Sequence, residues 1–220
     1  MYDWNLSIIW DYRQVYIQGA TITVALSVYA LAIALFLGLF VGIARQSKKR
    51  FLSLPASWYV EILRDTPLLV QIVWIFYCLP VLFDIRMTAF WSCVVALSVH
   101  FSAYVAEVIR AGIASISKGQ VDAAKVLGMT YVAAMRRIVL PQALRRMLPP
   151  LVNIFADIMK LSALASVIGV YELLHAVDNV IMNTFRPLEL YSALAVIYFL
   201  LIFPVAFTAR RVEMHFARRV

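Results

Sequence analysis

Residues with the chemistry to bind a solute or move a proton are few in this chain, and they lie within apolar stretches. Asp157 and Lys160 are three residues apart, so on a helix they share one face and can pair with each other. His100 and Glu107 share another helical face, because seven residues separate them and Tyr104 lies between. Charged groups inside a membrane are costly and usually face the interior of a helix bundle. These residues are therefore the candidates for a substrate path.

Each candidate also has a purely structural explanation. Asp157 and Lys160 either contact the ammonium or carboxylate of a zwitterionic solute or form an ion pair at a subunit interface, and the ion pair is favoured. Glu107 either lines the path or lies at the end of its helix and bonds Arg110, and the second is favoured. The residues alone leave these alternatives open.

Other kinds of site find no support in the sequence. Cys78 and Cys93 lie in apolar stretches without a CxxC pattern, and His175 and His215 have no metal ligands at useful spacing, so no metal site is predicted. No nucleophile and base are paired, which argues against a membrane enzyme. The chain also lacks a Walker A glycine loop, so any ATP hydrolysis must be supplied by another protein.

The composition predicts the kind of secondary structure that carries the candidate path residues. Of the 220 residues, 64% are hydrophobic and only 15% are charged, and the mean hydropathy is +0.85. This composition predicts an all-α membrane protein with a single transmembrane domain over 1–220. The uncharged stretches predict five transmembrane helices, at about 19–44, 66–83, 87–106, 149–170 and 190–209, after an interfacial N-terminal segment over 1–18.

The second of these spans is short and is expected to take length from the amphipathic stretch before it. Thr66-Pro67 separates the two, and a proline there either starts a new helix or kinks an old one. Within the amphipathic stretch, Glu61 and Arg64 are predicted to form a local pair.

The distribution of charge predicts the orientation in the membrane. Fifteen lysines and arginines lie in 45–50, 107–148 and 210–220, whereas the alternating regions between the spans hold three. Basic residues are enriched in cytoplasmic loops, so the N-terminus is predicted outside and the C-terminus inside. The same distribution explains the net charge of +8 without nucleic-acid binding, because the basic residues do not form one face.

The polar interval 107–148 carries an ordered spacing of small and apolar residues. Its fixed positions are Asp122, Ala123, Ala124, then Gly128 after three residues, then Ile138, Leu140 and Pro141 after nine more. This pattern predicts a short helix with small side chains, a turn at Gly128, and a second helix that ends at Pro141. Small side chains permit close approach of a partner's backbone. Without a partner, the same interval would be a pair of amphipathic interfacial helices.

This spacing resembles the coupling-loop signature of bacterial ABC importer permeases, Glu-Ala-Ala, three residues, Gly, nine residues, Ile-x-Leu-Pro. Asp122 replaces the glutamate and keeps its charge. Further stretches resemble the polar amino-acid uptake subfamily: Arg64 to Gln71, Tyr104 to Arg110, Leu140 to Arg145, Pro149 to Asn153 and Ser166 to Val170. The chain departs from that subfamily at Asp65, in the place of a glycine, and at Leu161, in the place of an acid.

The resemblance implies a type I ABC importer permease fold with five helices in a bacterial cytoplasmic (inner) membrane. It implies a permease subunit that is not itself an enzyme and binds no cofactor. The implied partners are a cytoplasmic ABC ATPase dimer carrying ATP and Mg, a second permease subunit, either identical or a sister, and an extracytoplasmic solute-binding protein. The implied cargo is a polar amino acid, and the implied ATPase-coupling loop is 107–148.

A second function class stays open from the residues alone. A secondary amino-acid transporter or channel would work without an ATPase and would need a proton or ion relay, for which His100, Glu107 and Asp157 are the available groups. A neighbouring gene that encodes a Walker A protein would favour the importer.

Overall fold

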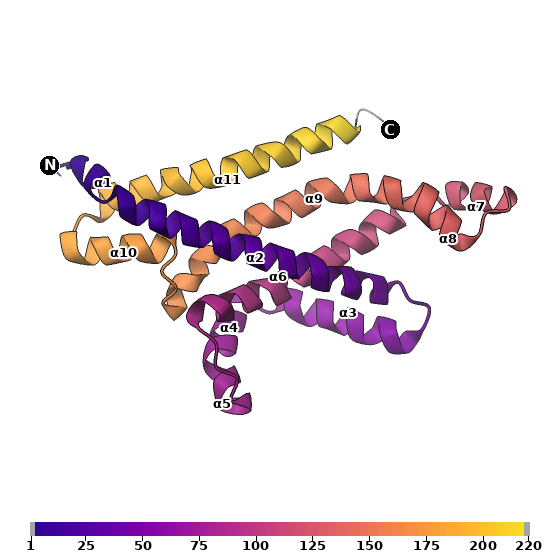
Figure 1. Cartoon of the computed structure of the whole chain (residues 1–220), viewed down its shortest axis with the longest axis horizontal. Coiled ribbons are helices and arrows are strands. Elements are labelled where there is room, and N and C mark those ends of the chain that lie inside the picture. The colour runs from indigo at the N-terminus through magenta and orange to yellow at the C-terminus, as the bar shows by residue number, and fades with distance from the viewer. Residues whose placement is uncertain (1–2, 218–220) are drawn as a thin grey trace.

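The structure is a computed structural model that describes residues 3–217. Within that range the chain is helical, with no β-strand. Four long helices dominate: α2 (Arg13–Arg45), α6 (Ala89–Ala114), α9 (Leu140–Leu161) and α11 (Pro187–Ala217). Figure 1 shows α2, α9 and α11 running lengthwise, with α1 (Ser7–Asp11) and α10 (Leu173–Thr184) at one end and α7 (Lys118–Val126) and α8 (Tyr131–Ala134) at the other. We call the α7–α8 end the basic end.

Four stretches of helix are long and apolar enough to cross a membrane: Arg13–Arg45, Ala89–Ala114, Tyr131–Ile168 and Pro187–Arg211. A fifth is a broken pair, Arg50–Asp65 with Leu68–Phe83, bent by 104°. The pair consists of α3 (Arg50–Asp65) followed by α4 (Leu68–Val73), the π-helical turn η1 (Trp74–Cys78) and α5 (Leu79–Phe83). The all-α fold with five predicted spans is thus confirmed, with one span broken.

The break after α3 arises from Pro67. Thr66 has φ −102° and ψ 137°, an extended conformation that a following proline imposes on the residue before it. The helix therefore ends at Asp65 and restarts at Leu68 in a new direction. Gln71 stabilises the corner, because its Nε2 donates to the Leu63 carbonyl at 3.0 Å and to Thr66 Oγ1 at 2.5 Å.

The centre of the core is the contact between α2 and α6. A stripe of small residues on α2 recurs about every fourth position: Thr23, Ser27, Ala30, Ala34, Gly38 and Gly42, all of them buried. Such stripes let helix backbones approach closely inside a membrane. At position 38 the close approach requires glycine, because a Cβ there would lie 2.5 Å from Val105 Cβ and 2.8 Å from the Ser102 carbonyl oxygen.

Two prolines lie inside helices, and each comes two residues after the end of a π-helical turn. The turn η1 ends at Cys78, two residues before Pro80, and the turn η2 (Met135–Val139) ends two residues before Pro141. A proline removes one backbone donor and its ring clashes with the carbonyl four residues earlier. That carbonyl lies within the π turn in both cases, so the wider turn accommodates the proline without ending the helix.

This accommodation corrects the expectation that a helix ends at Pro141. The helix instead continues from α8 through η2 into α9, and Pro149 and Pro150 lie inside α9 rather than at its start. The interval 107–148 is also more helical than a loop, since α6 extends to Ala114 and contains Glu107. The 3-10 segment η3 (Ser162–Ile168) follows α9. At the N-terminus, α2 begins at Arg13, inside the stretch 1–18 expected to be interfacial.

Candidate functional site

The α7–α8 hairpin carries the residues of the spaced signature. Ala124 is buried, whereas Asp122 and Ala123 are exposed, and Asp122 Oδ1 accepts a 2.9 Å hydrogen bond from Lys125 Nζ on the same helix. The hairpin therefore exposes Asp122 at its surface and buries Ala124.

Gly128 makes the turn between the two helices. Its φ is +73°, in the left-handed region that glycine adopts without strain. The Gly128 amide donates to the Lys125 carbonyl at 2.9 Å, and the Met129 amide donates to the Ala124 carbonyl at 3.0 Å. This pair of bonds is the Schellman arrangement that closes a helix C-terminus. A Cβ would meet no atom within 4 Å at Gly128, so the requirement for glycine comes from the backbone and not from space.

Exposed apolar side chains surround this turn. Val126 is 88% exposed and Leu127 is 79% exposed, and Tyr131 and Val132 of α8 are exposed next in the chain. We call these four residues the hairpin patch. Exposed apolar patches of this kind are typical of surfaces that contact another protein or a membrane.

Polar contacts join the hairpin to α9 and join α9 to the end of α6. Gln142 Nε2 on α9 donates to Gln120 Oε1 on α7 at 2.6 Å. Arg146 Nη1 on α9 donates to the carbonyl of Ser115, the residue that ends α6, at 2.5 Å. Ile138 lies in η2, and Leu140 and Pro141 begin α9, so the last positions of the signature belong to the helix that leaves the hairpin.

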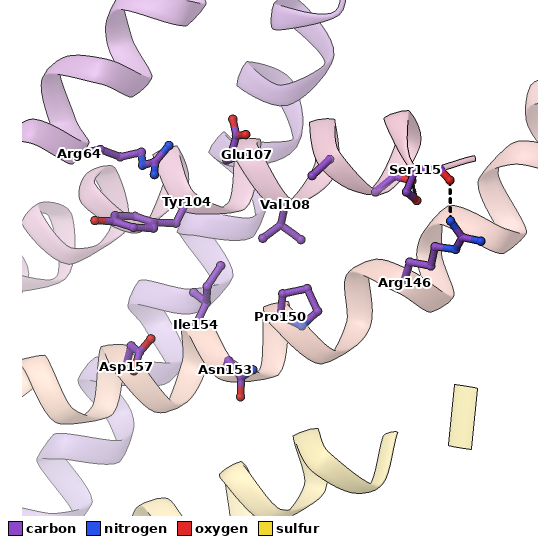
Figure 2. Close-up of a pocket in the computed structure, with 12 residues that line it drawn as sticks. Arg64, Tyr104, Glu107, Val108, Ser115, Arg146, Pro150, Asn153, Ile154 and Asp157 are labelled. Carbon is purple, nitrogen blue, oxygen red and sulfur yellow. Dashed lines mark hydrogen bonds between the residues drawn. The ribbon is translucent and has the colours of Figure 1, made fainter. Parts of the chain in front are cut away.

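Two adjoining cavities lie between α6 and α9. The larger, of about 470 Å³, is shown in Figure 2 and includes Glu107 and Asp157 in its walls. The smaller, of about 270 Å³, is lined by His100, Asp157 and Lys160 among others. Tyr104 and Asp157 line both cavities. The structure thus brings the four polar residues singled out in the sequence to one interhelical space.

Each of these residues has a partner in the chain. Lys160 Nζ lies 3.0 Å from Asp157 Oδ1 on the exposed side of α9, as the spacing predicts. Glu107 bonds Arg110, also as predicted, and in addition bonds Arg45 of α2 at 2.6 Å. His100 Nδ1 lies 3.2 Å from Gln71 Oε1. The Asp157–Lys160 pair is the one that a small solute can reach with least rearrangement, because both side chains are more than half exposed.

Arg64 was assigned a local role in the sequence but lines the larger cavity. The prediction of a pair with Glu61 is wrong: the Arg64 guanidinium lies over the Tyr104 ring, 5.4 Å from its centroid. Figure 2 shows Arg64 and Tyr104 together on one side of the cavity and Asp157 on the α9 side. The sequence carried no signal for this position of Arg64, because it depends on how α3 packs against α6.

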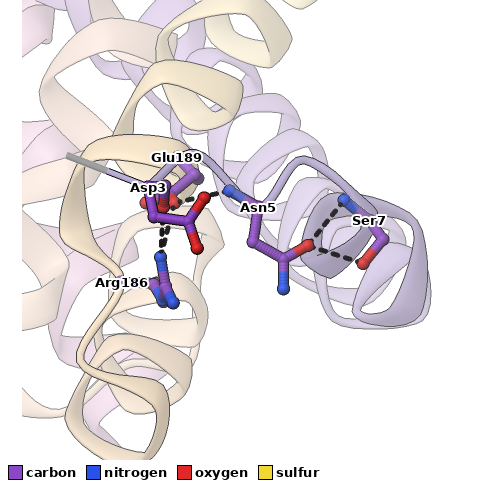
Figure 3. Close-up of polar contacts among 5 residues, drawn as sticks. All are labelled: Asp3, Asn5, Ser7, Arg186 and Glu189. Carbon is purple, nitrogen blue, oxygen red and sulfur yellow. Dashed lines mark hydrogen bonds and ion pairs between the residues drawn. The ribbon is translucent and has the colours of Figure 1, made fainter. Parts of the chain in front are cut away.

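The end opposite the hairpin is joined by polar contacts between the first residues and the start of α11. Arg186 Nη1 donates to the Asp3 carbonyl at 2.6 Å, and the Asn5 amide donates to Glu189 Oε1 at 3.1 Å, as Figure 3 shows. The Glu189 side chain is completely buried. These bonds hold α1 beside α10 and α11.

Comparison with known proteins identifies the family. Residues 34–218 match the family described as binding-protein-dependent transport system inner membrane component. The chain is 38% identical to the glutamine transport system permease protein GlnP of Escherichia coli K12 over 213 residues, 96% of each chain. It is 35% identical to the octopine transport system permease protein OccM of Rhizobium radiobacter, over 90% of this chain and 84% of that protein.

A solved structure agrees along the whole length. The crystal structure of an amino acid ABC transporter with histidines contains a chain that is 37% identical to this one, with a TM-score of 0.92 and complete coverage of both chains. The chain therefore belongs to the family of binding-protein-dependent transport system inner membrane components, and its fold is that of a type I ABC importer permease subunit.

Proposed function

We propose that the chain imports a polar amino acid across a bacterial cytoplasmic (inner) membrane, with its N-terminus outside and its C-terminus inside. The cargo class rests on the relatives, which are named for glutamine, octopine and amino acid transport. The orientation rests on the lysines and arginines of 45–50, 107–148 and 210–220, because basic residues are enriched in cytoplasmic loops.

ATP hydrolysis would be supplied by a separate ATPase dimer that holds ATP and Mg. The hairpin is the docking element in this proposal, with Asp122, Ala123, Ala124 and Gly128 at its tip and Ile138, Leu140 and Pro141 in the helix that leaves it. The hairpin patch matches an apolar partner surface. An extracytoplasmic solute-binding protein would deliver the cargo, and a second permease subunit, identical or a sister, would complete the path.

One observation carries the mechanism: the hairpin is bonded to α9, and α9 is bonded to the end of α6, so the two helices that wall the cavity are joined beside the hairpin. Arg146 ties α9 to the end of α6 at the hairpin's base, and the helix from α8 into α9 is continuous. A displacement of the hairpin by the ATPase is therefore transmitted to α6 and α9 together. The residues that line the space between them, His100, Glu107, Asp157 and Lys160, form the proposed substrate path.

Gly128→Val tests the coupling role of the hairpin. A β-branched residue in the left-handed region is strongly disfavoured, so the turn must change and the hairpin patch must move. The complex of permease, ATPase and binding protein is reconstituted in liposomes, and uptake and ATP hydrolysis are measured together. We expect uptake to fall at least about tenfold while ATPase co-purification weakens or hydrolysis persists without uptake.

Gly119→Ala is the matched control. Gly119 lies on α7, has open space around it and keeps an ordinary helical backbone, so alanine there fits without strain. Uptake by this variant should equal that of the wild type. Normal uptake and normal ATPase association in Gly128→Val would contradict the assignment of the hairpin.

A further inference from the structure

The connection from α2 to α3 carries a run of three basic residues. Lys48, Lys49 and Arg50 follow one another, and all three are exposed. In the part of the chain that the structure describes, no ion pair includes any of them. Arg45, which comes before them, is already paired with Glu107, a carboxylate that a second arginine shares. These three residues, which we call the basic turn, are therefore cations that no described carboxylate neutralises.

The basic turn has a defined backbone. The Ser47 amide donates to the Ala44 carbonyl at 3.1 Å, and the Lys49 amide donates to Ser47 Oγ at 3.2 Å. Lys49 Nζ lies 5.9 Å from the centroid of the Phe51 ring. Figure 1 shows the connection from α2 to α3 at the same end of the molecule as α7 and α8. The three cations are thus displayed on an ordered turn at the basic end.

Large apolar side chains line the outer face of α3, directly after the basic turn. Phe51, Leu54, Trp58 and Ile62 are all exposed, and their spacing of three or four residues places them on one face of the helix. We call them the α3 stripe. The opposite face, which includes the buried Val60, packs against α6. A helix with cations at its start and an exposed apolar face fits the depth at which phosphate headgroups meet acyl chains.

Other occupants fit this surface less well than a lipid does. A soluble anion would be attracted by the basic turn but would leave the α3 stripe uncovered. A second copy of the chain would have the same orientation in the membrane, so its own basic turn would lie at the same level. Like charges that face each other across an interface cost free energy. An anionic lipid satisfies both parts of the surface, because its headgroup is negative and its chains are apolar.

We propose that the basic turn and the α3 stripe form a binding site for an anionic phospholipid. Lys48, Lys49 and Arg50 bind the phosphate headgroup, and the acyl chains lie along the stripe. None of these residues lines either cavity between α6 and α9, so the site is separate from the proposed substrate path. The inference rests on the proposed function only for the orientation, which places the lipid in the cytoplasmic leaflet.

The test measures lipid binding by the complex of permease and ATPase in detergent. Native mass spectrometry counts bound dioctanoyl phosphatidylglycerol, dioctanoyl phosphatidylcholine and glycerol 3-phosphate over a range of concentrations. The wild type should bind the anionic lipid at least about tenfold more tightly than the zwitterionic lipid. It should bind glycerol 3-phosphate at least about tenfold more weakly than the anionic lipid, because this headgroup carries no chains.

The double variant Lys48→Gln/Arg50→Gln tests the cations. Each basic residue near an anionic headgroup contributes about fivefold in affinity, so the loss of two should weaken phosphatidylglycerol binding by about 25-fold and leave phosphatidylcholine binding unchanged. Lys48→Arg/Arg50→Lys keeps both charges and should bind phosphatidylglycerol as the wild type does. If the first variant does not fold, as its unfolding temperature reports, the lipid preference of the wild type and the Trp58→Gln variant below carry the test.

Arg210→Gln/Arg211→Gln is the matched control. Both arginines are exposed near the end of α11, so their loss removes the same charge from another basic segment. Phosphatidylglycerol binding by this control should stay within about twofold of the wild type. Trp58→Gln tests the α3 stripe: it should weaken both lipids by at least about threefold, since the chains lose an apolar contact, and leave glycerol 3-phosphate binding unchanged.

Four results overturn the inference. They are equal binding of the two lipids by the wild type, unchanged phosphatidylglycerol binding in Lys48→Gln/Arg50→Gln, an equal loss in the Arg210→Gln/Arg211→Gln control, and glycerol 3-phosphate binding as tight as that of the lipid. Release of the ATPase from Lys48→Gln/Arg50→Gln with unchanged lipid binding would assign the basic turn to the ATPase instead. ATP-driven uptake by the wild-type complex tests the proposed function separately, because its loss rejects that function and leaves the lipid measurements as they are.

Discussion

Arg45 at the end of α2 donates a 2.6 Å hydrogen bond from Nη1 to Oε2 of Glu107 on α6. The Arg45 side chain is 14% exposed and that of Glu107 is 28% exposed, so the pair is largely shielded from water. Arg110 bonds both carboxylate oxygens from the next turn of α6. One carboxylate thus joins two helices at the basic end, beside the larger cavity.

We expect Glu107→Gln to destabilise the protein more than it affects cargo recognition. Loss of the charge leaves two arginines near each other without a counter-ion, at a cost of about 2 kcal/mol. The Glu107 oxygens already accept hydrogen bonds from Arg45 and Arg110 and are not available to the cargo, so the KM of uptake should stay close to the wild-type value. Thermal unfolding in detergent measures the first effect, and uptake by proteoliposomes measures the second.

Arg45→Gln and the double variant complete this test. If the two residues act as a pair, the double variant should be less destabilised than the sum of the single variants. Strict additivity would contradict the pairing, and a large rise in KM would show that Glu107, which lines the proposed substrate path, also contacts the cargo directly.

Gly38→Ala should destabilise the contact between α2 and α6. The added Cβ meets Val105 Cβ and the Ser102 carbonyl oxygen at distances that real structures avoid, and backbone and β-branched atoms cannot move aside cheaply. Overpacking of this kind costs about 1–3 kcal/mol. The unfolding temperature should fall for Gly38→Ala and remain unchanged for Gly119→Ala, where the Cβ meets nothing. An unfolding temperature of Gly38→Ala equal to that of the wild type would contradict the close contact between α2 and α6 at Gly38.

The spans could be predicted because each depends on local hydropathy and on charge between apolar runs. The Asp157–Lys160 ion pair could be predicted from helix geometry, whereas Glu61 and Arg64, at the same three-residue spacing, do not pair because the Arg64 guanidinium lies over Tyr104. Glu107–Arg110 is a second pair that could be predicted. What these features share is that they require no knowledge of how one helix packs on another.

Features that depend on packing between helices could not be predicted. The position of Arg64 over Tyr104 follows from a bend of 104° that the Thr66-Pro67 step permits but does not specify. The bond from Arg45 to Glu107 spans 62 residues and needs the α2–α6 contact. The continuation through Pro141 depends on a π turn, which has no signature in local propensity.

Asp122→Lys should release the ATPase without unfolding the permease. Asp122 is exposed and, among the residues that the structure describes, pairs only with Lys125 on its own helix, so the pair adds little stability. Reversal of the charge alters the tip of the proposed docking element, whereas Asp122→Glu restores the residue of the family signature and should bind normally. Co-purification of the ATPase checks both variants. Lys125→Ala removes the same ion pair without reversing a charge, and ATPase loss in that control would shift the explanation from charge to helix stability.

Glu172 makes the stability of the α10 end depend on pH. Its buried carboxylate caps α10 by accepting from the Leu174 and His175 amides at 2.9 and 2.8 Å, and Tyr198 Oη of α11 donates to it at 2.9 Å. Burial raises the pKa of Glu172 above its ordinary value of 4.5, and this effect exceeds the opposing effect of the hydrogen bonds. The folded state therefore favours the protonated carboxyl.

The sign of the pH dependence follows from that raised pKa. The stabilisation from Glu172 is fully present below about pH 4.5, where the unfolded chain is also protonated, and is lost as pH rises through the folded pKa. Glutamine cannot ionise, so the unfolding temperature of the wild type relative to Glu172→Gln should fall between pH 5 and pH 8. Asp84→Asn, which changes an exposed carboxylate in the α5–α6 turn, should show no such trend. A difference between wild type and Glu172→Gln that is constant with pH would mean that Glu172 is ionised in the folded protein throughout, with its three donors outweighing its burial.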